Sequence, residues 1–279
     1  MTNLTQENYY EDMDFLSFSR YKRYIECEAK AYASDFWNYD SNTDNTALLV
    51  GNYVHSYFES DEAHKKFIED YEDELLAKTG KNKGRLKSNF LIAESMIDTL
   101  KGDDNFKRLY HGYSEDELEK EMIVVGEIEG VPFKGKLDSV NLSRGYFVDL
   151  KTMKSIYSEE YNRELRQRVP AVVNNILNYK YHGQLAVYRE LLRQTIGSDF
   201  RACIVAVSKE SIPDKEIIKV DEEWLSEGLE EIKDNIKHVW DVINGVEKPK
   251  RCGRCDYCRS TKKLAGIVSM NDLMEVTNG

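Results

Sequence analysis

Residues 121–152 have the sequence EMIVVGEIEGVPFKGKLDSVNLSRGYFVDLKT, and this stretch gives the strongest indication of the fold class. It contains three short runs rich in β-branched and apolar residues, as expected for strands. Glu129 and Gly130 separate the first two runs, and the triplet 143–145 separates the last two. Such short polar and glycine-containing segments are typical of hairpin turns. The stretch therefore predicts a three-strand meander.

Helices are expected on both sides of this meander, because apolar residues recur there at helical spacing. Serines suited to capping precede the first of them. A charged connection leads from the meander to a long helix, and two further strands and a last helix follow. The expected helices are 17–36, 46–60, 88–100, one long helix at 172–194, and a helix near 221–244, with strands at 202–208 and 216–220.

This order of elements predicts an α/β fold in which a mixed β-sheet lies between helices, an α/β/α sandwich. We expect one continuous domain in three parts. Residues 1–115 form a mainly helical N-terminal part carrying Cys27 and His55, residues 116–245 form the core, and residues 246–279 form a cysteine-rich segment and tail. The helical N-terminal region and the cysteine-rich segment are expected to be additions to the sandwich.

The charge of the chain is unevenly distributed. A net charge of -11 argues against a protein that coats nucleic acid non-specifically, because such binding neutralises phosphates with Lys and Arg. Residues 248–263, however, carry seven basic residues and one acidic residue, and we interpret them as a surface that faces nucleic acid. Residues 78–87 have no acidic residue, and both a nucleic-acid contact and a solvated loop stay open for them.

No segment is apolar over the roughly 18 residues that a membrane helix needs. The first residues lack the basic and apolar regions of a signal peptide, so a cytoplasmic location without membrane attachment is expected.

Three residues of the meander indicate metal chemistry. Asp149 and Lys151 share one face of a strand because side chains alternate along it, and Asp138 lies on the neighbouring strand. Mg²⁺ and Mn²⁺ prefer oxygen ligands, which two such carboxylates supply. A bound ion of this kind supports hydrolysis of a phosphodiester, with Lys151 orienting the attacking water or neutralising charge. An ordinary surface ion pair is the alternative.

The segments GKLDSV and FVDLKT resemble motifs II and III of the PD-(D/E)xK nuclease superfamily, and more closely its RecB-like branch. That branch has a G-x-x-x-H helix upstream, matched by Gly51 and His55 in GNYVHSYFE. It also places Q-x-x-x-Y on the helix after motif III, matched by Gln184 and Tyr188 in YHGQLAVY, one helical turn apart. A lone histidine or a Gln/Tyr pair is more often structural. Their order along the chain, which matches the order of the motifs in that branch, favours a role for them in the active site.

The resemblance implies a restriction-endonuclease-like fold and a divalent metal site. The implied ligands for one or two Mg²⁺ or Mn²⁺ ions are His55, Asp138, Asp149 and the backbone carbonyl of Leu150. The implied catalytic residues are Asp138, Asp149, Lys151, Gln184 and Tyr188. In this reading Gln184 hydrogen-bonds the lysine or a DNA phosphate, and Tyr188 contacts the DNA backbone or a base.

Two more charged residues stay open. Glu121 begins the first run of the meander, where an acidic residue assists metal binding in some relatives. Lys136 lies two residues before Asp138 on the same face, so either a phosphate contact or simple exposure is expected for it.

The cysteines indicate a metal centre. Cys252, Cys255 and Cys258 have the spacing C-x2-C-x2-C, which lets three thiolates converge on one centre. Cys27 occupies the place where cluster-containing RecB-like nucleases carry an isolated cysteine, so the resemblance implies a [4Fe–4S] cluster, with Zn²⁺ as the alternative. Cys203, inside ACIVAVS, is expected to be a buried strand residue.

The whole chain looks most like phage and prophage exonucleases related to exodeoxyribonuclease VIII. The function implied is a metal-dependent exonuclease that degrades linear double-stranded DNA, 5′→3′, and passes the exposed strand to a recombination partner such as a single-strand annealing protein. A homo-oligomeric ring is one way to concentrate positive potential in this acidic protein. The alternatives are a single-strand-preferring nuclease of CRISPR-adaptation or helicase-nuclease type, and a non-catalytic module that binds DNA ends.

Overall fold

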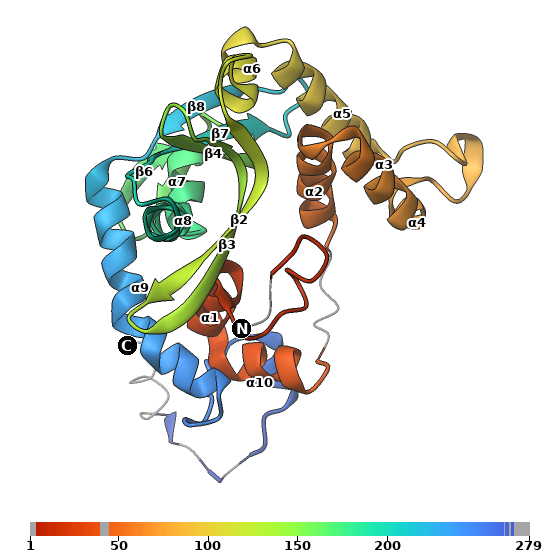
Figure 1. Ribbon diagram of the computed structural model, residues 1–279. Coiled ribbons are helices and arrows are strands. Elements are labelled where there is room, and N and C mark those ends of the chain that lie inside the picture. Colours follow the sequence, from red (N-terminus) through yellow and green to blue (C-terminus); the bar gives the residue numbers. More distant parts are fainter. Residues whose placement is uncertain (1–3, 40–44, 265, 268, 271–279) are drawn as a thin grey trace.

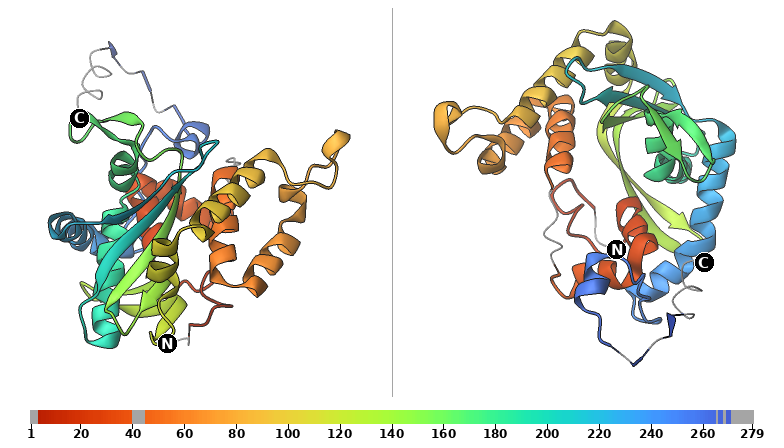
Figure 2. Two further views of the ribbon diagram at one scale, coloured as in Figure 1. Left: turned by 90° about the horizontal axis from the view of Figure 1, so that it is seen from above. Right: turned by 180° about the vertical axis from the view of Figure 1, so that it is seen from behind.

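The computed structural model describes residues 4–39, 45–264, 266–267 and 269–270, and it has a mixed sheet between two layers of helices (Figure 1). Figure 2 shows the sheet and the helices on its two sides from above and from behind. The main sheet has the order β1-β3-β4-β7-β8, with β2 also paired to β3. Its strands are β1 (Leu16–Ser17), β2 (Leu118–Ile128), β3 (Val131–Asn141), β4 (Tyr146–Met153), β7 (Arg201–Ser208) and β8 (Lys215–Lys219). The predicted mixed sheet between helices is confirmed.

The predicted meander is formed by β2, β3 and β4. Its first turn has positive φ at both Glu129 (50°) and Gly130 (75°), the pattern of the two-residue turns that match strand twist. Its second turn ends on Gly145, with φ of 63°. β4 then pairs in parallel with β7, and β7 pairs antiparallel with β8.

One edge of β3 is shared by two strands, and this arrangement opens the sheet. β1 pairs with one end of β3 through Ser17 and Lys134, while β4 pairs with the other end through Val148 and Ser139. Between these ends, none of the described strands pairs with residues 135–138 on that edge. Asp138 therefore lies where β3 and β4 separate.

One helical layer comes from the N-terminal part of the chain. Helices α2 (Thr46–Glu59), α5 (Ser88–Lys101) and α6 (Asp104–His111) form a buried cluster with Tyr146, Val148 and Leu150 of β4. The helices predicted at 46–60 and 88–100 are thus confirmed, but the view of this region as an addition to the sandwich is wrong. Apolar side chains of β4 that point away from the other layer need a cover, and these helices provide it.

A projection extends from this layer. It contains α3 (Asp61–Asp70), α4 (Glu72–Leu75) and the short 3-10 helix η1 (Gly80–Asn82), none of which was predicted (Figure 1). Contacts between the rings of Tyr53 and Phe67 and of Tyr57 and His64 show that α3 packs antiparallel to α2.

The other layer consists of α1 (Phe18–Phe36), α7 (Ala171–Asn178), α8 (Tyr181–Ile196) and α9 (Glu222–Ile243). Helices α8 and α9 cross closely, because a Cβ atom on Gly228 would lie only 2.8 Å from Cα of Gly183. The prediction of a single helix over 172–194 is wrong. Lys180 has a left-handed conformation, with φ of 55°, which ends one helix and starts the next.

The charged connection before α7 holds a small hairpin, β5 (Glu159–Asn162) and β6 (Gln167–Pro170). Helix α1 begins as predicted, since the Ser17 side chain accepts a hydrogen bond from the Arg20 amide. Residues 271–279 of the predicted tail lie outside the described residues. Across the described ranges, no helix has the length and apolarity required to traverse a bilayer.

Candidate active site and cysteine centre

The two predicted aspartates meet where β3 and β4 separate. The backbone N–H of Leu150 on β4 donates to Oδ2 of Asp138 at 2.6 Å. This side chain of β3 thus accepts the hydrogen bond that a backbone carbonyl of a paired strand would otherwise accept. Asp138 is 9% exposed and Asp149 is 3% exposed. Because the N–H and C=O of a strand residue point to the same side, the Leu150 carbonyl also faces this gap.

Lys151 lies beside Asp149, as strand alternation predicted. Its Nζ is 2.7 Å from Oδ2 of Asp149 and 4.7 Å from the centre of the Tyr181 ring. This ion pair is the contact that Oδ2 makes. In the described part of the chain, no other donor reaches this buried oxygen. A carboxylate this deeply buried is costly to ionise unless positive charge lies beside it, and the Lys151 ammonium supplies one such charge.

Helix α2 brings His55 to the same place from a distant part of the sequence. Nδ1 of His55 is 3.4 Å from Oδ1 of Asp138. One turn earlier, Gly51 faces β4, and a Cβ atom there would lie 3.5 Å from Oγ1 of Thr152. The helix therefore approaches the strand closely at Gly51, and His55 reaches the aspartate from the next turn.

The electrostatics of these groups are coupled. Burial raises the pKa of Asp149, and Lys151 only partly offsets that effect. Burial also opposes the charged form of Asp138, but His55 and Lys151 outweigh it and lower the pKa of Asp138 below its usual value. Burial by itself lowers the pKa of His55. The Asp138 carboxylate raises this pKa by more than burial lowers it, so the pKa of His55 lies above its ordinary value. The site thus holds carboxylates that need positive charge.

Glu121 lies directly opposite Asp138 in the β2–β3 register, between the pairs Lys120↔Ser139 and Met122↔Leu137. Its φ is 50°, and its carbonyl accepts a hydrogen bond from Nε2 of Gln6 at 2.7 Å. Burial, followed by the Asp138 charge, raises the pKa of Glu121 to about 7.

Lys136 pairs with Glu121, with Nζ 2.7 Å from Oε2. Lys136 is half-buried by this contact, so simple exposure, one of the two outcomes expected for it, is ruled out.

Gln184 and Tyr188 lie together on α8, as predicted. Nε2 of Gln184 donates to the Tyr188 hydroxyl at 2.9 Å. Tyr188 is only 8% exposed, and a Cβ atom on Gly135 would lie 2.8 Å from its ring. Its ring therefore packs under β3. The aromatic group that contacts Lys151 is Tyr181, which sequence reasoning missed, although it lies three residues before Gln184 on the same helical face.

The residues present fit a divalent cation. Three carboxylates, of Glu121, Asp138 and Asp149, are each 9% exposed or less. Lys136 pairs with Glu121, Lys151 pairs with Asp149, and His55 lies beside Asp138. Carboxylate oxygens in this number are the environment that Mg²⁺ and Mn²⁺ prefer.

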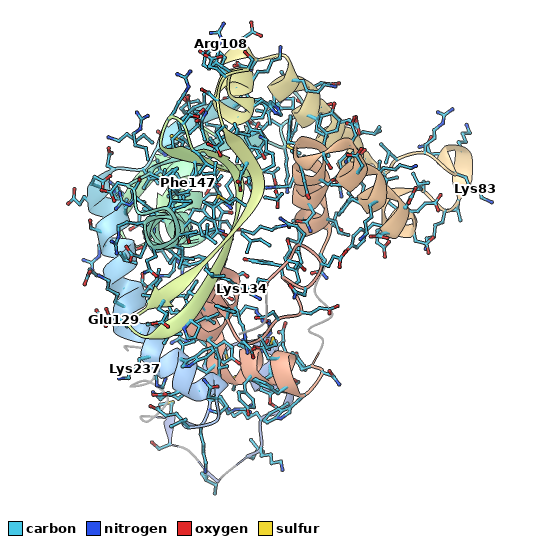
Figure 3. The ribbon with its side chains drawn as sticks, in the orientation of Figure 1. Lys83, Arg108, Glu129, Lys134, Phe147 and Lys237 are labelled. Atoms are coloured by element: carbon cyan, nitrogen blue, oxygen red, sulfur yellow. The ribbon has the colours of Figure 1, made fainter. Side chains whose placement is uncertain are left out.

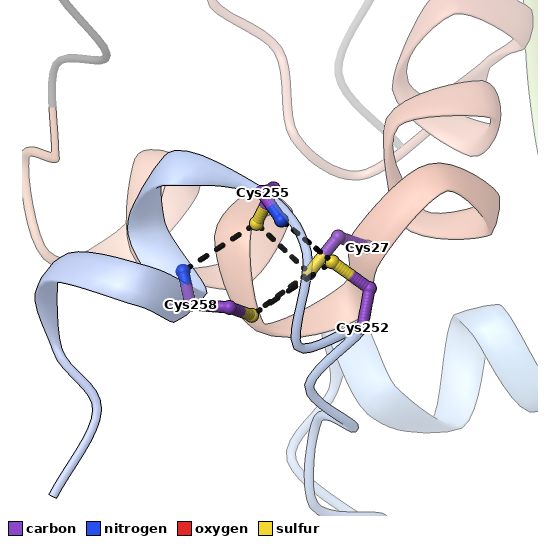
Figure 4. Close-up of side chains that lie close together, drawn as sticks. All are labelled: Cys27, Cys252, Cys255 and Cys258. Atoms are coloured by element: carbon purple, nitrogen blue, oxygen red, sulfur yellow. Dashed lines mark hydrogen bonds between the residues drawn. The ribbon is translucent and has the colours of Figure 1, made fainter. Parts of the chain in front are cut away.

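The four predicted cysteines come together beside the middle of α1 (Figure 4). The sulfur atoms of Cys27, Cys252, Cys255 and Cys258 all lie within 4.8 Å of one another. The amides of Cys255 and Cys258 donate to the sulfurs three residues earlier, at 3.3 and 3.5 Å. Backbone N–H groups lower the pKa of Cys252 to about 6, which favours the thiolate that binds metals.

A break in α1 places Cys27 in this group. Cys27 has extended backbone angles, φ -167° and ψ 104°, inside the helix. Next to the break, the Ala29 amide donates to the Lys250 carbonyl at 2.9 Å, and the Lys250 amide donates to the Glu28 carboxylate at 2.7 Å. Cys203 lies on β7 and is half-buried, so the expectation of a buried residue is wrong. Strand β7 contributes alternate residues to each face, and Cys203 sits beside Lys219 of the outer strand β8.

The two basic segments are both at the surface. All residues from 78 to 85 are exposed, and Lys83 projects far from the body of the protein (Figure 3). In the segment 248–263, Arg251 donates to the Cys258 carbonyl at 2.8 Å, and Arg259 pairs with Asp256.

Comparison with known proteins identifies the family. A family model described as "PDDEXK-like domain of unknown function (DUF3799)" matches residues 17–261. The crystal structure of a protein named "Putative exonuclease" from Eubacterium rectale is similar to this chain, with a TM-score of 0.84, 31% sequence identity and 98% of each chain covered. A second solved structure, named SSO0001, is 17% identical with a TM-score of 0.28 over 90% of this chain and 96% of that chain, which carries no argument. A search of the curated proteins gave no match.

These findings confirm the predicted superfamily and its mixed sheet flanked by helices, and they support a nuclease at a general level. The family match spans both groups of residues described above, because residues 17–261 include the candidate active site and all four cysteines of the cysteine centre. The chain belongs to the family of PDDEXK-like domains.

Proposed function

We propose that this protein is a Mg²⁺- or Mn²⁺-dependent exonuclease that hydrolyses phosphodiester bonds of linear double-stranded DNA. The observation that carries the proposal is the convergence of His55, Asp138, Asp149 and Lys151 from α2, β3 and β4 around two buried carboxylates. A divalent cation would offset the repulsion between these two carboxylates.

Each residue has a role in the proposed mechanism. His55, Asp138, Asp149 and the Leu150 carbonyl would hold the ion, which would lower the pKa of a bound water and offset charge on the phosphate. Asp149 holds the Lys151 ammonium at 2.7 Å, where it can orient the attacking water and neutralise the phosphate. Gln184 supports this site indirectly, because its amide fixes the Tyr188 hydroxyl beneath β3.

The finer parts of the proposal rest on resemblance. Digestion from a 5′ end, a place in phage-type recombination beside a single-strand annealing protein, a cytoplasmic location and a homo-oligomeric ring are typical of the phage exonucleases that the sequence resembles. The name of the similar Eubacterium rectale protein supports exonuclease chemistry. The exposed basic segments at 78–87 and 248–263 supply positive charge for DNA in an otherwise acidic protein.

Digestion of a linear duplex labelled at either its 5′ or its 3′ end tests the proposal. We expect Mg²⁺-dependent release of the 5′ label first, and no release by Asp138→Ala. Equal cutting of single-stranded DNA would favour the nuclease of CRISPR-adaptation or helicase-nuclease type. Failure to cut any DNA with Mg²⁺ or Mn²⁺, together with unchanged DNA binding by Asp149→Ala, would favour a non-catalytic module that binds DNA ends.

We also propose that Cys27, Cys252, Cys255 and Cys258 bind a structural metal centre. Resemblance to cluster-containing nucleases supports [4Fe–4S]. The close sulfur spacing, within 4.8 Å, suits a single tetrahedral Zn²⁺, because sulfurs that bind the corners of a four-iron cluster must stand further apart. Visible absorbance of anaerobically purified protein that disappears on reduction would establish iron–sulfur. A colourless protein with one zinc per chain would establish the alternative.

A further inference from the structure

The break between α7 and α8 is an unusual backbone feature next to the candidate active site. Lys180 adopts a left-handed conformation, with φ of 55°, although such a conformation is unfavourable for residues other than glycine. Its side chain is held by α9, because Nζ donates to both carboxylate oxygens of Glu231, at 2.5 and 2.7 Å. A non-glycine residue fixed in this way is often found where backbone geometry serves a function.

The break places two tyrosines side by side. The rings of Tyr179 and Tyr181, on either side of Lys180, are stacked with centroids 5.7 Å apart and an interplanar angle of 24°. The centre of the Tyr181 ring lies 4.7 Å from Nζ of Lys151, and the centre of the Tyr179 ring lies 5.6 Å from Nζ of Lys22 on α1. A continuous row therefore leads from Lys151 through both rings to Lys22.

The two rings differ in burial. Tyr181 is half-buried between Lys151 and its neighbour, whereas Tyr179 is 50% exposed at the end of the row. An exposed aromatic ring that rests on a second ring and is flanked by a cation offers a flat surface for another planar group. Proteins that bind single strands use this combination of aromatic stacking and positive charge.

We propose that Tyr179 stacks on a nucleobase of the DNA strand being cut, next to the scissile phosphate, and that Lys22 contacts a neighbouring phosphate of that strand. This inference rests on the proposed nuclease function, since it assumes that the scissile phosphate lies beside Asp149 and Lys151. Tyr181 supports the stacking ring from below, and Lys180 is a positioning residue that sets the angle between the two helices.

The partner is a base released from the duplex stack rather than an intact base pair. Bases inside a duplex already stack on both faces, whereas a base at a DNA end has a free face. Stacking does not depend on base identity, because every base has a π-face. The row would therefore hold the strand end without imposing sequence preference, as a nuclease acting on DNA ends requires.

The test compares Tyr179→Ala and Tyr179→Phe with the wild-type protein on DNA ends that contain one abasic site at successive positions. Removal of the ring is expected to raise KM about 5- to 100-fold, the scale of a single base–aromatic stack, while kcat changes little. Phenylalanine keeps the stack and is expected to behave like the wild type. Tyr113→Ala is the matched control, because Tyr113 is also an exposed tyrosine over a cation, 4.6 Å from Arg144, and lies on the α6–β2 connection.

The abasic series separates stacking from a merely structural role. At the position that Tyr179 contacts, the missing base should raise KM for the wild type but not for Tyr179→Ala, since that variant has no stack to lose. An equal abasic penalty in both proteins, or a KM for Tyr179→Ala within about twofold of the wild type, would overturn the inference.

Measuring DNA binding instead of cleavage tests the stacking inference separately from the proposed nuclease function. The Kd for a labelled oligonucleotide, measured with Ca²⁺ in place of Mg²⁺, gives the effect of the variant and of the abasic site without cleavage. A wild-type protein that cuts no DNA contradicts the nuclease proposal. Even in that case, stacking is supported if the abasic site raises the Kd for the wild type but not for Tyr179→Ala. Stacking is contradicted if the abasic site raises the Kd equally for both proteins.

Discussion

Asp149 is the residue of the site whose surroundings most favour the binding of an additional cation. Its carboxylate is 3% exposed, its pKa is raised by burial, and its ion pair is with Lys151. The negative charge of Asp138 raises the pKa of Asp149 further, and Lys151 acts on both carboxylates. Two buried carboxylates beside one lysine distinguish the site from an ordinary buried ion pair.

The first prediction concerns this carboxylate. Asp149→Asn keeps the shape of the side chain but removes the charge that holds both the ion and Lys151, so cleavage is expected to fall by at least about 100-fold. Mn²⁺ binding followed by electron paramagnetic resonance should weaken in parallel, and thermal unfolding should stay cooperative. Full activity in Asp149→Asn would contradict the assigned ligand set.

At the scale of residues, the sequence predicted neighbours along one strand better than contacts across the fold. Asp149 and Lys151 share a face because side chains alternate along a strand, and this rule depends only on the local sequence. The contact between His55 and Asp138 needed the resemblance, since 83 positions of sequence separate them and no local rule joins such residues. The contact of Tyr181 with Lys151 depends on the break before α8, which no local pattern revealed.

At the scale of elements, the crossing of α8 and α9 is fixed by two glycines. A Cβ atom on Gly228 would lie 2.8 Å from Cα and 2.9 Å from the backbone N of Gly183. Backbone atoms cannot move aside as a flexible side chain can. The close approach also sets α8, which carries Tyr181, Gln184 and Tyr188 to the site.

The second prediction follows from this crossing. Gly228→Ala should lower the free energy of unfolding by about 1–3 kcal/mol, the usual cost of overpacking, because α9 must shift away from α8. Gly51→Ala is the matched control. There the new Cβ meets Thr152 at 3.5 Å, an ordinary contact, and the higher helix propensity of alanine should stabilise the protein by about 0.5–1 kcal/mol. Urea denaturation of both variants measures the difference, and equal effects would refute the argument.

Most helices and strands could be predicted because their apolar residues recur at a regular spacing. The breaks within helices could not be predicted. The 172–194 segment has continuous helical spacing, and Lys180 is not a residue type that signals a break. The break coincides with a tertiary contact, the pairing of Lys180 with Glu231 on α9. In α1, the break at Cys27 similarly accompanies contacts with Lys250 far along the chain. Such contacts are not local to the sequence.

The third prediction concerns the break in α1. Cys27→Ser removes a ligand of the proposed metal centre, and metal content should fall sharply. Because that centre joins α1 to the C-terminal segment, its removal should lower the free energy of unfolding by about 2–4 kcal/mol, as does the removal of a crosslink. Cys203→Ser is the control, since Cys203 lies on β7 away from the four sulfurs and its metal content should not change. Metal analysis and thermal unfolding measure both effects, and an unchanged metal content in Cys27→Ser would contradict the prediction.

At the scale of the whole molecule, the loop of the projection is one of two surface segments rich in positive charge. The chain has a net charge of -11, yet residues 78–87 carry five basic residues and no acidic one. The projection is ordered by backbone hydrogen bonds, including Ala77 to Arg85 and Gly84 to Ala77, both 2.9 Å. Helix α3 runs back along α2, the helix that carries His55, and the basic loop follows α4.

The last prediction tests whether this loop contacts the DNA backbone. Lys81, Lys83 and Arg85 are exposed on it, and replacing all three by serine should weaken DNA binding mainly at low salt. The slope of log K against log salt concentration should become shallower by roughly 0.9 for each phosphate that the loop no longer neutralises. Cleavage of a short duplex at saturating concentration should change little, because none of the three residues lies at the site.

A matched triple variant separates a contact from a general effect of charge. Arg163, Lys219 and Lys237 are exposed as well, and Lys237 lies on the opposite side of the protein from Lys83 (Figure 3). Serine at these positions removes the same charge from the molecule. If the loop contacts DNA, the salt dependence changes in the loop variant and stays near the wild-type value in the control. Equal changes in both variants would mean that only the net charge matters and that the loop is solvated.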